Sequence, residues 1–180
     1  MHALTLDHPT LTTPAHDCAL CPRLSAGREA APAAPKGPAS ARLLVVGMAP
    51  HPTDALLIPT LHRLGLADQA EPDGATLHDI RLTHAVRCPP PHHLPDPAEV
   101  RTCNQYLAAE LATLPNLRAV LAHAAVLKAC GIPPTRIRFS HGAIHDLPDG
   151  LILADCDHAA PPERQEATIL ALLKRLEDEA

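Results

Sequence analysis

Aromatic side chains are almost absent from this sequence: tryptophan does not occur, and Tyr106 and Phe139 are the sole tyrosine and phenylalanine among 180 residues. Aromatic rings are the usual platforms on which proteins stack exposed nucleic-acid bases. A base bound here would therefore lie against aliphatic, histidine or proline surfaces, or against Phe139. The core must be built from Leu, Ala, Val and Ile, and the length predicts a single domain, 1–180.

Basic charge is also scarce. Fifteen Lys and Arg residues stand against twenty Asp and Glu residues, which gives a formal net charge of -5 at pH 7. This balance argues against a broad basic face with salt-sensitive, nonspecific affinity for DNA, although it leaves room for a local basic patch. Thirteen histidines make the surface less negative as the pH falls toward their reference pKa of roughly 6.5.

Long apolar runs are missing too. No segment approaches the roughly 20 apolar residues that a membrane-spanning helix needs, and residues 1–18 lack the charged and apolar regions of a signal peptide. We therefore expect a cytoplasmic protein. In that reducing compartment the six cysteines are expected to be metal ligands or small buried side chains rather than disulfides.

Short apolar segments alternate with helical patterns along the chain. This order predicts an α/β/α sandwich with a central, mostly parallel, four-stranded sheet. The expected strands are Arg42–Gly47, Ile80–Arg87, Leu117–Leu121 and Gly150–Ala154. The expected helices are Ala55–Gly65, Pro97–Leu114, His123–Cys130 and Pro162–Glu179. Residues 1–41 form an N-terminal segment that ends in an irregular connector rich in Ala, Pro and Gly.

Ligands of such sheets bind at the carboxyl ends of the parallel strands. The loops expected at this edge are Met48–Asp54, His84–Pro91 and Asp155–Pro161. The sequence therefore predicts a binding site where these three loops converge.

Four cysteines have a spacing that suggests a metal centre. Cys18 and Cys21 form a C-x2-C pair, and the fourteen residues between Cys88 and Cys103 include a proline-rich turn that can bring these two together. Four thiolates suit either a 4Fe-4S cluster or tetrahedral zinc, and the residues alone do not choose between them. The alternative is that they are small buried hydrophobic residues, which is the interpretation we prefer for Cys130 and Cys156.

Several motifs together resemble one known group of proteins, the iron-sulfur uracil-DNA glycosylases of families 4 and 5, and the type-b members of family 5 above all. The motifs run in the family's order over nearly the whole chain. They read C-A-L-C-P-R-L, L-L-V-V-G-M-A-P, L-T-H-A-V-R-C-P-P-P, P-D-P-A-E-V-R-T-C-N-Q-Y-L, H-G-A-I-H-D-L-P-D-G and D-C-D-H-A-A.

The resemblance implies excision of uracil, or of another deaminated base, after the base has been flipped out of DNA into a pocket. It also implies that the cluster is a structural 4Fe-4S centre, with zinc as the alternative. Gly47, Met48, Ala49 and Pro50 would form the first active-site loop against the base. His158 would stabilise the negative charge that grows on the uracil oxygen as the glycosidic bond breaks.

The sequence departs from the family pattern at the positions that would form the active site. The long polar loop that follows G-x-A-P in type-b enzymes is shortened here, and Ala159-Ala160 follows His158 without the usual Ser. His84 stands where family 4 enzymes carry an Asn that binds the base, and an imidazole can donate to a carbonyl but cannot make an amide's paired contact.

His51 and Asp54 lie where a general base or a water-orienting group is wanted. The alternative for Asp54 is a carboxylate at a helix N-terminus, and for His51 a solvated loop residue. His92 and His93 are treated as part of an exposed proline-rich turn, because the four cysteines already complete a metal site.

Two functions follow from these residues. The first is a DNA glycosylase that acts on uracil in DNA, and the second is a catalytically inactive member of the family that binds nucleic acid or protein. A zinc-stabilised α/β protein unrelated to DNA is a third possibility, which a colourless sample would support. We expect a monomer, and no protein partner is indicated.

Overall fold

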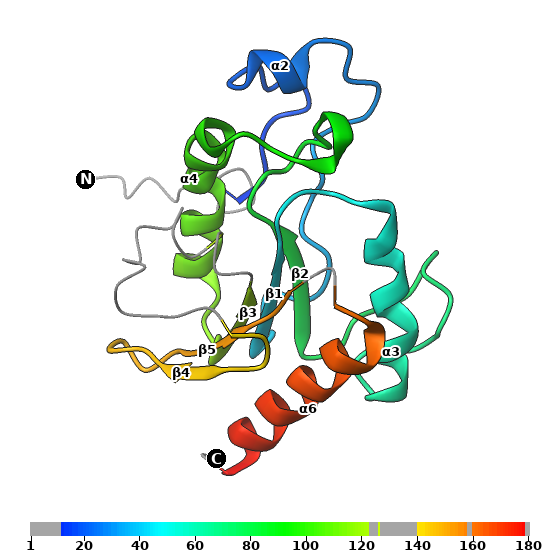
Figure 1. Cartoon of the computed structure of the whole chain (residues 1–180), viewed down its shortest axis with the longest axis vertical. Helices are drawn as coiled ribbons and strands as arrows, with labels where there is room; N and C mark the ends of the chain where they lie inside the picture. The colour runs from blue at the N-terminus through cyan, green and yellow to red at the C-terminus, as the bar shows by residue number, and fades with distance from the viewer. Residues whose placement is uncertain (1–11, 123–125, 127–139, 158–159, 179–180) are drawn as a thin grey trace, which may run out of the picture.

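The protein is described by a computed structural model that covers residues 12–122, 126, 140–157 and 160–178. Its centre is a five-stranded sheet with the strand order β2-β1-β3-β5-β4 (Figure 1). The strands are β1 (Leu43–Gly47), β2 (Ile80–His84), β3 (Ala119–Ala122), β4 (Ile144–Asp146) and β5 (Ile152–Asp155). The described helices are α2 (Pro22–Ser25), η1 (Pro52–Leu56), α3 (Leu57–Arg63), η2 (Pro91–His93), α4 (Pro97–Thr113) and α6 (Pro162–Asp178).

The four expected strands are present and pair in parallel, which confirms the predicted α/β class. The predicted count of four strands is wrong, because β4 adds an antiparallel strand at the edge beside β5. This strand has three residues and the sequence Ile-His-Asp, with Ile144 and Asp146 exposed. So short and polar an edge strand carries none of the apolar pattern from which strands are recognised.

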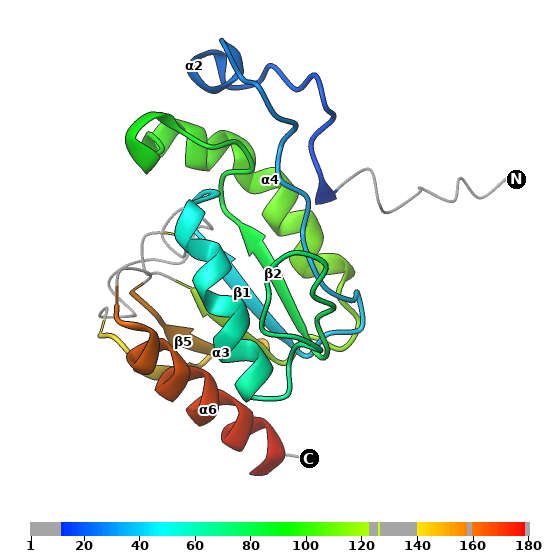
Figure 2. The same cartoon turned by 90° about the vertical axis from the view of Figure 1, so that its right-hand side faces the viewer.

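The two faces of the sheet bury different sets of side chains, because successive residues of a strand point to opposite sides. Leu44 and Val46 of β1 belong to a core under α4, whereas Leu43 and Val45 belong to a core under α3 and α6. Figure 2 shows α4 on one side of the sheet and α3 and α6 on the other. The structure therefore confirms the expected three layers.

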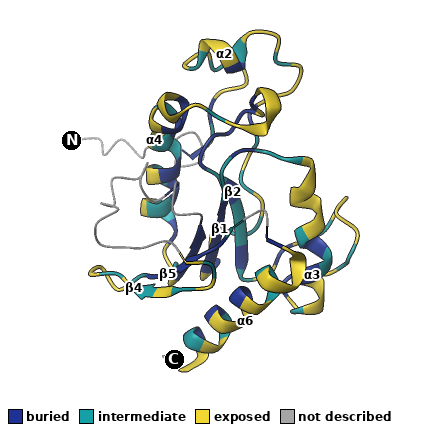
Figure 3. Ribbon diagram, in the orientation of Figure 1, coloured by how far each residue is buried: buried dark blue, intermediate teal, exposed yellow. Residues whose placement is uncertain are grey.

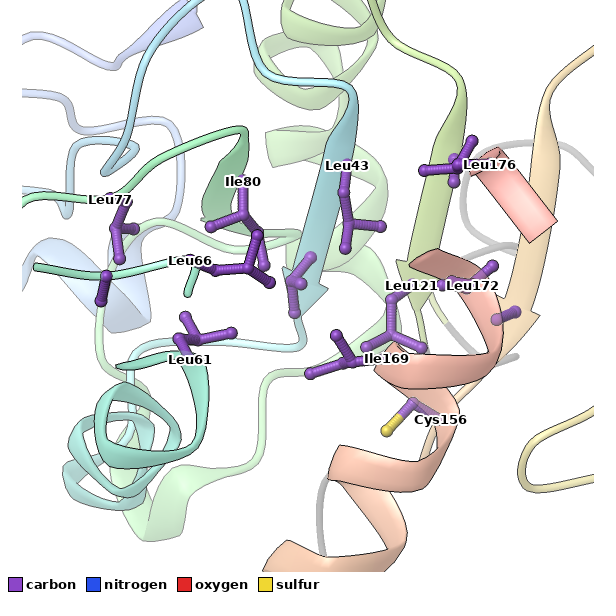
Figure 4. Packing of buried hydrophobic residues seen from close by; sticks show 14 of the residues in the cluster. Leu43, Leu61, Leu66, Leu77, Ile80, Leu121, Cys156, Ile169, Leu172 and Leu176 are labelled. Atoms are coloured by element: carbon purple, nitrogen blue, oxygen red, sulfur yellow. The ribbon is translucent and has the colours of Figure 1, made fainter. Parts of the chain in front are cut away.

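The second of these cores is wholly aliphatic apart from one thiol. Figure 4 shows Leu61, Ile169 and Leu172 directed at the strands, with Cys156 among them. Cys156 is 1% exposed, as expected for a small core residue. The prediction for Cys130 and most of the predicted helix His123–Cys130 lie outside the described residues.

Helix starts are set by local capping. Asp96 and Glu99 form a capping box at the start of α4, with Pro97 in the first turn, as the sequence predicts. The predicted start of the preceding helix at Ala55 is too late, because a 3-10 turn begins at Pro52 and leads into α3.

None of the helices within the described ranges is both long and apolar enough to span a bilayer. Figure 3 shows buried strands in the middle of the molecule and exposed outer faces on α3 and α6. The strands β1 and β2 are neighbours that run in the same direction, and so their carboxyl ends lie side by side. The loops that follow them meet at this edge.

Candidate functional site

All four cysteines of the predicted metal site line one cavity. Cys18 and Cys21 lie in the loop before α2, Cys88 follows β2, and Cys103 lies in the second turn of α4. Cys88 and Cys103 are buried, while Cys18 and Cys21 are partly exposed. Three segments distant in sequence thus bring their thiol groups to one place.

An ion pair holds two of these segments together. Arg23 of α2 donates to Glu99 of α4 through Nε at 2.9 Å and Nη2 at 2.6 Å. The Arg23 guanidinium holds the pKa of Glu99 below its usual value, and so Glu99 stays charged. Figure 1 shows α2 beside the first turn of α4 at one end of the molecule. The Cys18–Cys21 loop is thereby fixed against the helix that carries Cys103.

Burial opposes the ionisation of Cys21 and Cys103. Burial, with smaller contributions from the neighbouring Cys103, Glu99, Cys88 and Cys18, raises the pKa of Cys21 to about 11. Burial also raises the pKa of Cys103, against the opposing effect of the Arg87 N–H group and side chain. Four thiolates around one cavity need a cation to neutralise them, and thiolates are the ligands that zinc and iron-sulfur clusters take.

The donor set therefore fits a tetrathiolate centre. Within the described ranges, no three His, Cys, Asp or Glu side chains are grouped closely enough to hold a single ion. A 4Fe-4S cluster takes one cysteine at each iron, so its ligands surround a cavity, as the four cysteines do here.

Buried positive charge lies behind this cavity. Glu110 of α4 accepts from Arg87 Nη2 and from Arg81 Nε, both at 2.6 Å, and Arg87 and Glu110 are 0% exposed. Thr83 donates to Glu110 Oε2 at 2.7 Å and accepts from Arg87. Two guanidinium groups share one carboxylate, and Nε of Arg87 finds no partner among the described residues. An anionic centre held by Cys88 and Cys103 would balance this excess charge.

The carboxyl edge of the sheet carries the second group of predicted residues. Gly47 and His84 are paired across β1 and β2. A Cβ atom at Gly47 would lie 2.8 Å from Cδ2 of His84, and so only glycine lets the imidazole pack against this loop. The ladder continues past the strands, since Val86 donates its N–H to the carbonyl of Met48 at 3.0 Å. Ala49 is buried and Pro50 is partly exposed.

His84 and Asp54 form a hydrogen-bonded pair at this edge. Nε2 of His84 lies 2.9 Å from Oδ2 of Asp54, and the same oxygen accepts the N–H of His51 at 2.9 Å. Burial favours a higher pKa for Asp54, but the hydrogen bonds from His84 and His51 outweigh it and hold this pKa below its usual value. Asp54 is therefore an ionised, oriented carboxylate whose side chain is 46% exposed.

His51 is ordered by its own turn. Its Nδ1 accepts the N–H of Thr53 at 3.1 Å, and its ring packs edge-on against His93 with centroids 4.3 Å apart. His51 is thus the N-cap of the 3-10 turn, and Asp54 is the carboxylate of its capping box. Asp54 performs the capping role that we considered as the alternative, and it also binds His84.

The structure brings His51, Asp54, His84 and Gly47 together at one edge, and it gathers the four cysteines separately. His158 lies outside the described residues, so its catalytic role stays a prediction, as do the assigned roles of the other site residues. Asp155, at the end of β5, is fully buried and accepts from His145 Nε2 at 3.2 Å. Nothing in the sequence indicates this pair, because Asp155 closes an aliphatic strand and His145 lies in β4, which carries no strand pattern.

Arg28, Arg87 and Glu110 were missed as well. Arg28 lies in the N-terminal segment 1–41, whose composition indicates an irregular connector, and Arg87 closes the expected strand Ile80–Arg87. Glu110 follows the pattern of an ordinary helix. Of these three residues, only Arg87 has a signal in the sequence, which is its position directly before Cys88.

No protein-family model matches the sequence. Individual proteins, however, are similar to it over most of its length. A type-5 uracil-DNA glycosylase of Thermus thermophilus is 32% identical, over 82% of this chain and 84% of that protein. Another of Mycobacterium leprae is 31% identical, over 83% of each chain, and one of Pyrobaculum aerophilum is 32% identical, over 71% of this chain and 72% of its own. Each of these likenesses covers more than two thirds of both chains, and the chain therefore belongs to the type-5 uracil-DNA glycosylase family.

Proposed function

We propose that this protein hydrolyses the N-glycosidic bond of uracil, or of a related deaminated base, in DNA. The observation that carries this proposal is the Asp54 carboxylate, which His51 and His84 hold at the carboxyl edge of the sheet, next to the Gly47 loop. Parallel sheets bind their ligands at this edge. A fixed, ionised carboxylate is what an enzyme needs there to direct a water molecule.

The reaction needs one water molecule and no other co-reactant. The water oxygen bonds to C1′ of the deoxyribose, the C1′–N1 bond breaks, and its electron pair leaves with the base. Both protein hydrogen bonds to the Asp54 carboxylate end on Oδ2, and none of the described residues donates to Oδ1. Oδ1 is therefore the oxygen that would accept a proton from the water.

His84 orients Asp54 in this scheme. Its Nδ1 is buried and has no partner within the described part of the chain, so Nε2 is the nitrogen that can contact a ligand. A contact between His84 and a base carbonyl would have to share the N–H that now bonds to Asp54. His158 is proposed to stabilise the departing base, as the family resemblance implies.

The cofactor that we propose is a 4Fe-4S cluster on Cys18, Cys21, Cys88 and Cys103. The cluster would supply a covalent crosslink between the N-terminal loop, the end of β2 and helix α4. It lies on a different segment from Asp54, and no chemical step passes through it. The convergent thiols and the buried excess of positive charge support this proposal.

The test is strand cleavage. The anaerobically purified protein is incubated with a labelled oligonucleotide that carries one central uracil, and the product is treated with alkali. We expect breaks at the uracil position that are absent from a matched thymine oligonucleotide and from the Asp54→Asn variant. Intact strands in the presence of folded, brown protein would contradict the proposal and would leave a binding protein. A colourless protein containing zinc would contradict the cluster alone.

A further inference from the structure

Arg28, for which the sequence indicates no function, lies at the cysteine cavity. Its side chain is half-buried and lines the cavity together with the cysteines. Nη1 donates to Sγ of Cys88 at 3.4 Å and to the carbonyl of Cys18 at 3.0 Å, and Nη2 donates to the carbonyl of His16 at 2.5 Å. One guanidinium therefore contacts three groups on two segments that are sixty or more residues apart.

The three acceptors show what Arg28 does. Two of them are carbonyls of the loop that carries Cys18, and the third is Sγ of Cys88, four residues after the end of β2. Arginine suits such a task because its planar group offers several donors in a fixed arrangement and is always charged. Arg28 thus joins the N-terminal cysteine loop to Cys88 and brings a positive charge to a ligand sulfur.

Hydrogen bonds to the ligand sulfurs and nearby charge set the reduction potential of an iron-sulfur cluster. A cluster with four thiolates carries net negative charge, and each added electron increases it. An N–H donor that bears positive charge favours the reduced form. Arg28 is placed to act from the partly exposed side, while the buried Arg87 acts from the side of the core.

We propose that Arg28 is a positioning residue for the metal centre. Its guanidinium raises the reduction potential of the cluster and holds the N-terminal loop against it. This inference rests on the cluster in the proposed function. It assigns Arg28 no part in the cleavage of the glycosidic bond.

Arg23 provides a matched control. It belongs to the same N-terminal segment, five residues earlier, and it also makes charged hydrogen bonds across to a distant segment. Its partner is Glu99 rather than a cysteine, and it does not line the cavity. An effect of loosening the N-terminal cysteine loop would appear in both variants, whereas an effect of positive charge at a ligand sulfur would be specific to Arg28.

The experiment compares Arg28→Gln and Arg23→Gln with the unaltered protein, each purified without oxygen. Two quantities are measured: the reduction potential, by dye-mediated titration followed by electron paramagnetic resonance, and the half-life of the visible absorbance in excess iron chelator. For Arg28→Gln we expect the ratio of reduced to oxidised cluster at a fixed potential to fall about tenfold, which is a fall of about 59 mV in the potential of a one-electron couple, and we expect faster loss of colour. Arg23→Gln should keep the potential.

If Arg28→Gln does not fold, Arg28→Lys replaces it, and we expect a potential below that of Arg23→Gln by less than about 59 mV, because the charge remains while the fork of donors is lost. Equal potentials and half-lives in the Arg28 variant and the unaltered protein would overturn the inference. A shift of equal size in Arg23→Gln would also overturn it. Unaltered protein without iron and sulfide would instead overturn the proposed cofactor, and this inference with it.

Discussion

The cysteine cavity and the Asp54–His84 edge share one segment, since Cys88 follows His84 by only four residues. They are built differently. The cavity draws its side chains from three distant segments, and in one of them Arg87, which forms a buried ion pair with Glu110, directly precedes Cys88. The edge uses two adjacent strand ends and one turn, and its carboxylate is 46% exposed. Long-range, buried contacts suit a centre that stabilises the fold, whereas a half-exposed carboxylate suits a group that must meet water and substrate.

This comparison predicts the largest loss of stability at the cavity. Replacing Cys88 with Ser removes one ligand of the proposed cluster, and we expect loss of the brown colour and a fall of more than about 4 kcal/mol in the free energy of unfolding. Chemical denaturation and iron analysis measure both. Cys156→Ser is the matched control: it places a hydroxyl in the other core, costs about 1–3 kcal/mol and keeps the iron. Unchanged iron in Cys88→Ser would remove this residue from the metal site.

The next largest effect is expected at the edge, on rate rather than on stability. Asp54→Asn removes the proton acceptor and should lower kcat by at least about 100-fold, with the cluster spectrum unchanged. Asp68→Asn serves as the control, because Asp68 likewise accepts a backbone N–H, from Thr76, in a turn away from the edge. Single-turnover cleavage of the uracil oligonucleotide gives the rates. Similar rates for the two variants would assign the chemistry to another group.

A smaller effect is expected from Gly47→Ala. The added Cβ would meet Cδ2 of His84 at 2.8 Å, so the imidazole must move and its bond to Asp54 is disturbed. We expect a loss of about tenfold in kcat, as for a small displacement of a catalytic group. In a His84→Ala background the same substitution should cost little more, which a double-mutant cycle measures. Additive losses would show that Gly47 acts independently of His84.

The smallest effect concerns the titration of Asp54. His84 and the His51 N–H hold its pKa below the usual 3.8, so its carboxylate stabilises the fold above that pH and this contribution is lost as the pH falls through the lower native value. His84→Phe removes one hydrogen bond and should raise the pKa of Asp54. Nuclear magnetic resonance of the side-chain carboxyl follows this change. A pKa that stays where it was would show that the His84 bond contributes little.

Much of the architecture was predictable because its signals are local. The aliphatic run ending at Gly47, and the Asp96–Glu99 capping box before α4, indicate a buried strand and a helix start without knowledge of the rest. The short edge strand β4 was not predictable, because three residues that alternate between exposed and half-buried positions resemble a loop. The early turn at Pro52 was missed for a related reason: histidine is an unusual N-cap.

The site was predictable where residue type implies chemistry, and hidden where it does not. Cysteine spacing identified the four thiols that line the cavity, and the loop after Gly47 pointed to Asp54. Arginine and glutamate occur on every surface, so nothing in the sequence distinguished Arg28 or Glu110. Their roles appear only when a sulfur or a second buried charge lies within hydrogen-bonding distance.

The sequence by itself determined the succession of the four parallel strands and of α3, α4 and α6, and it determined the family, because periodicity, capping and motifs act over short stretches of chain. Only the tertiary structure decided which partners the charged side chains take. The hydrogen bond of His84 with Asp54, the contact of Arg28 with Cys88 and the sharing of Glu110 by two arginines join residues that are at least 23 positions apart. Such contacts depend on how the layers pack, since burial makes each charge require a partner that the local sequence does not specify.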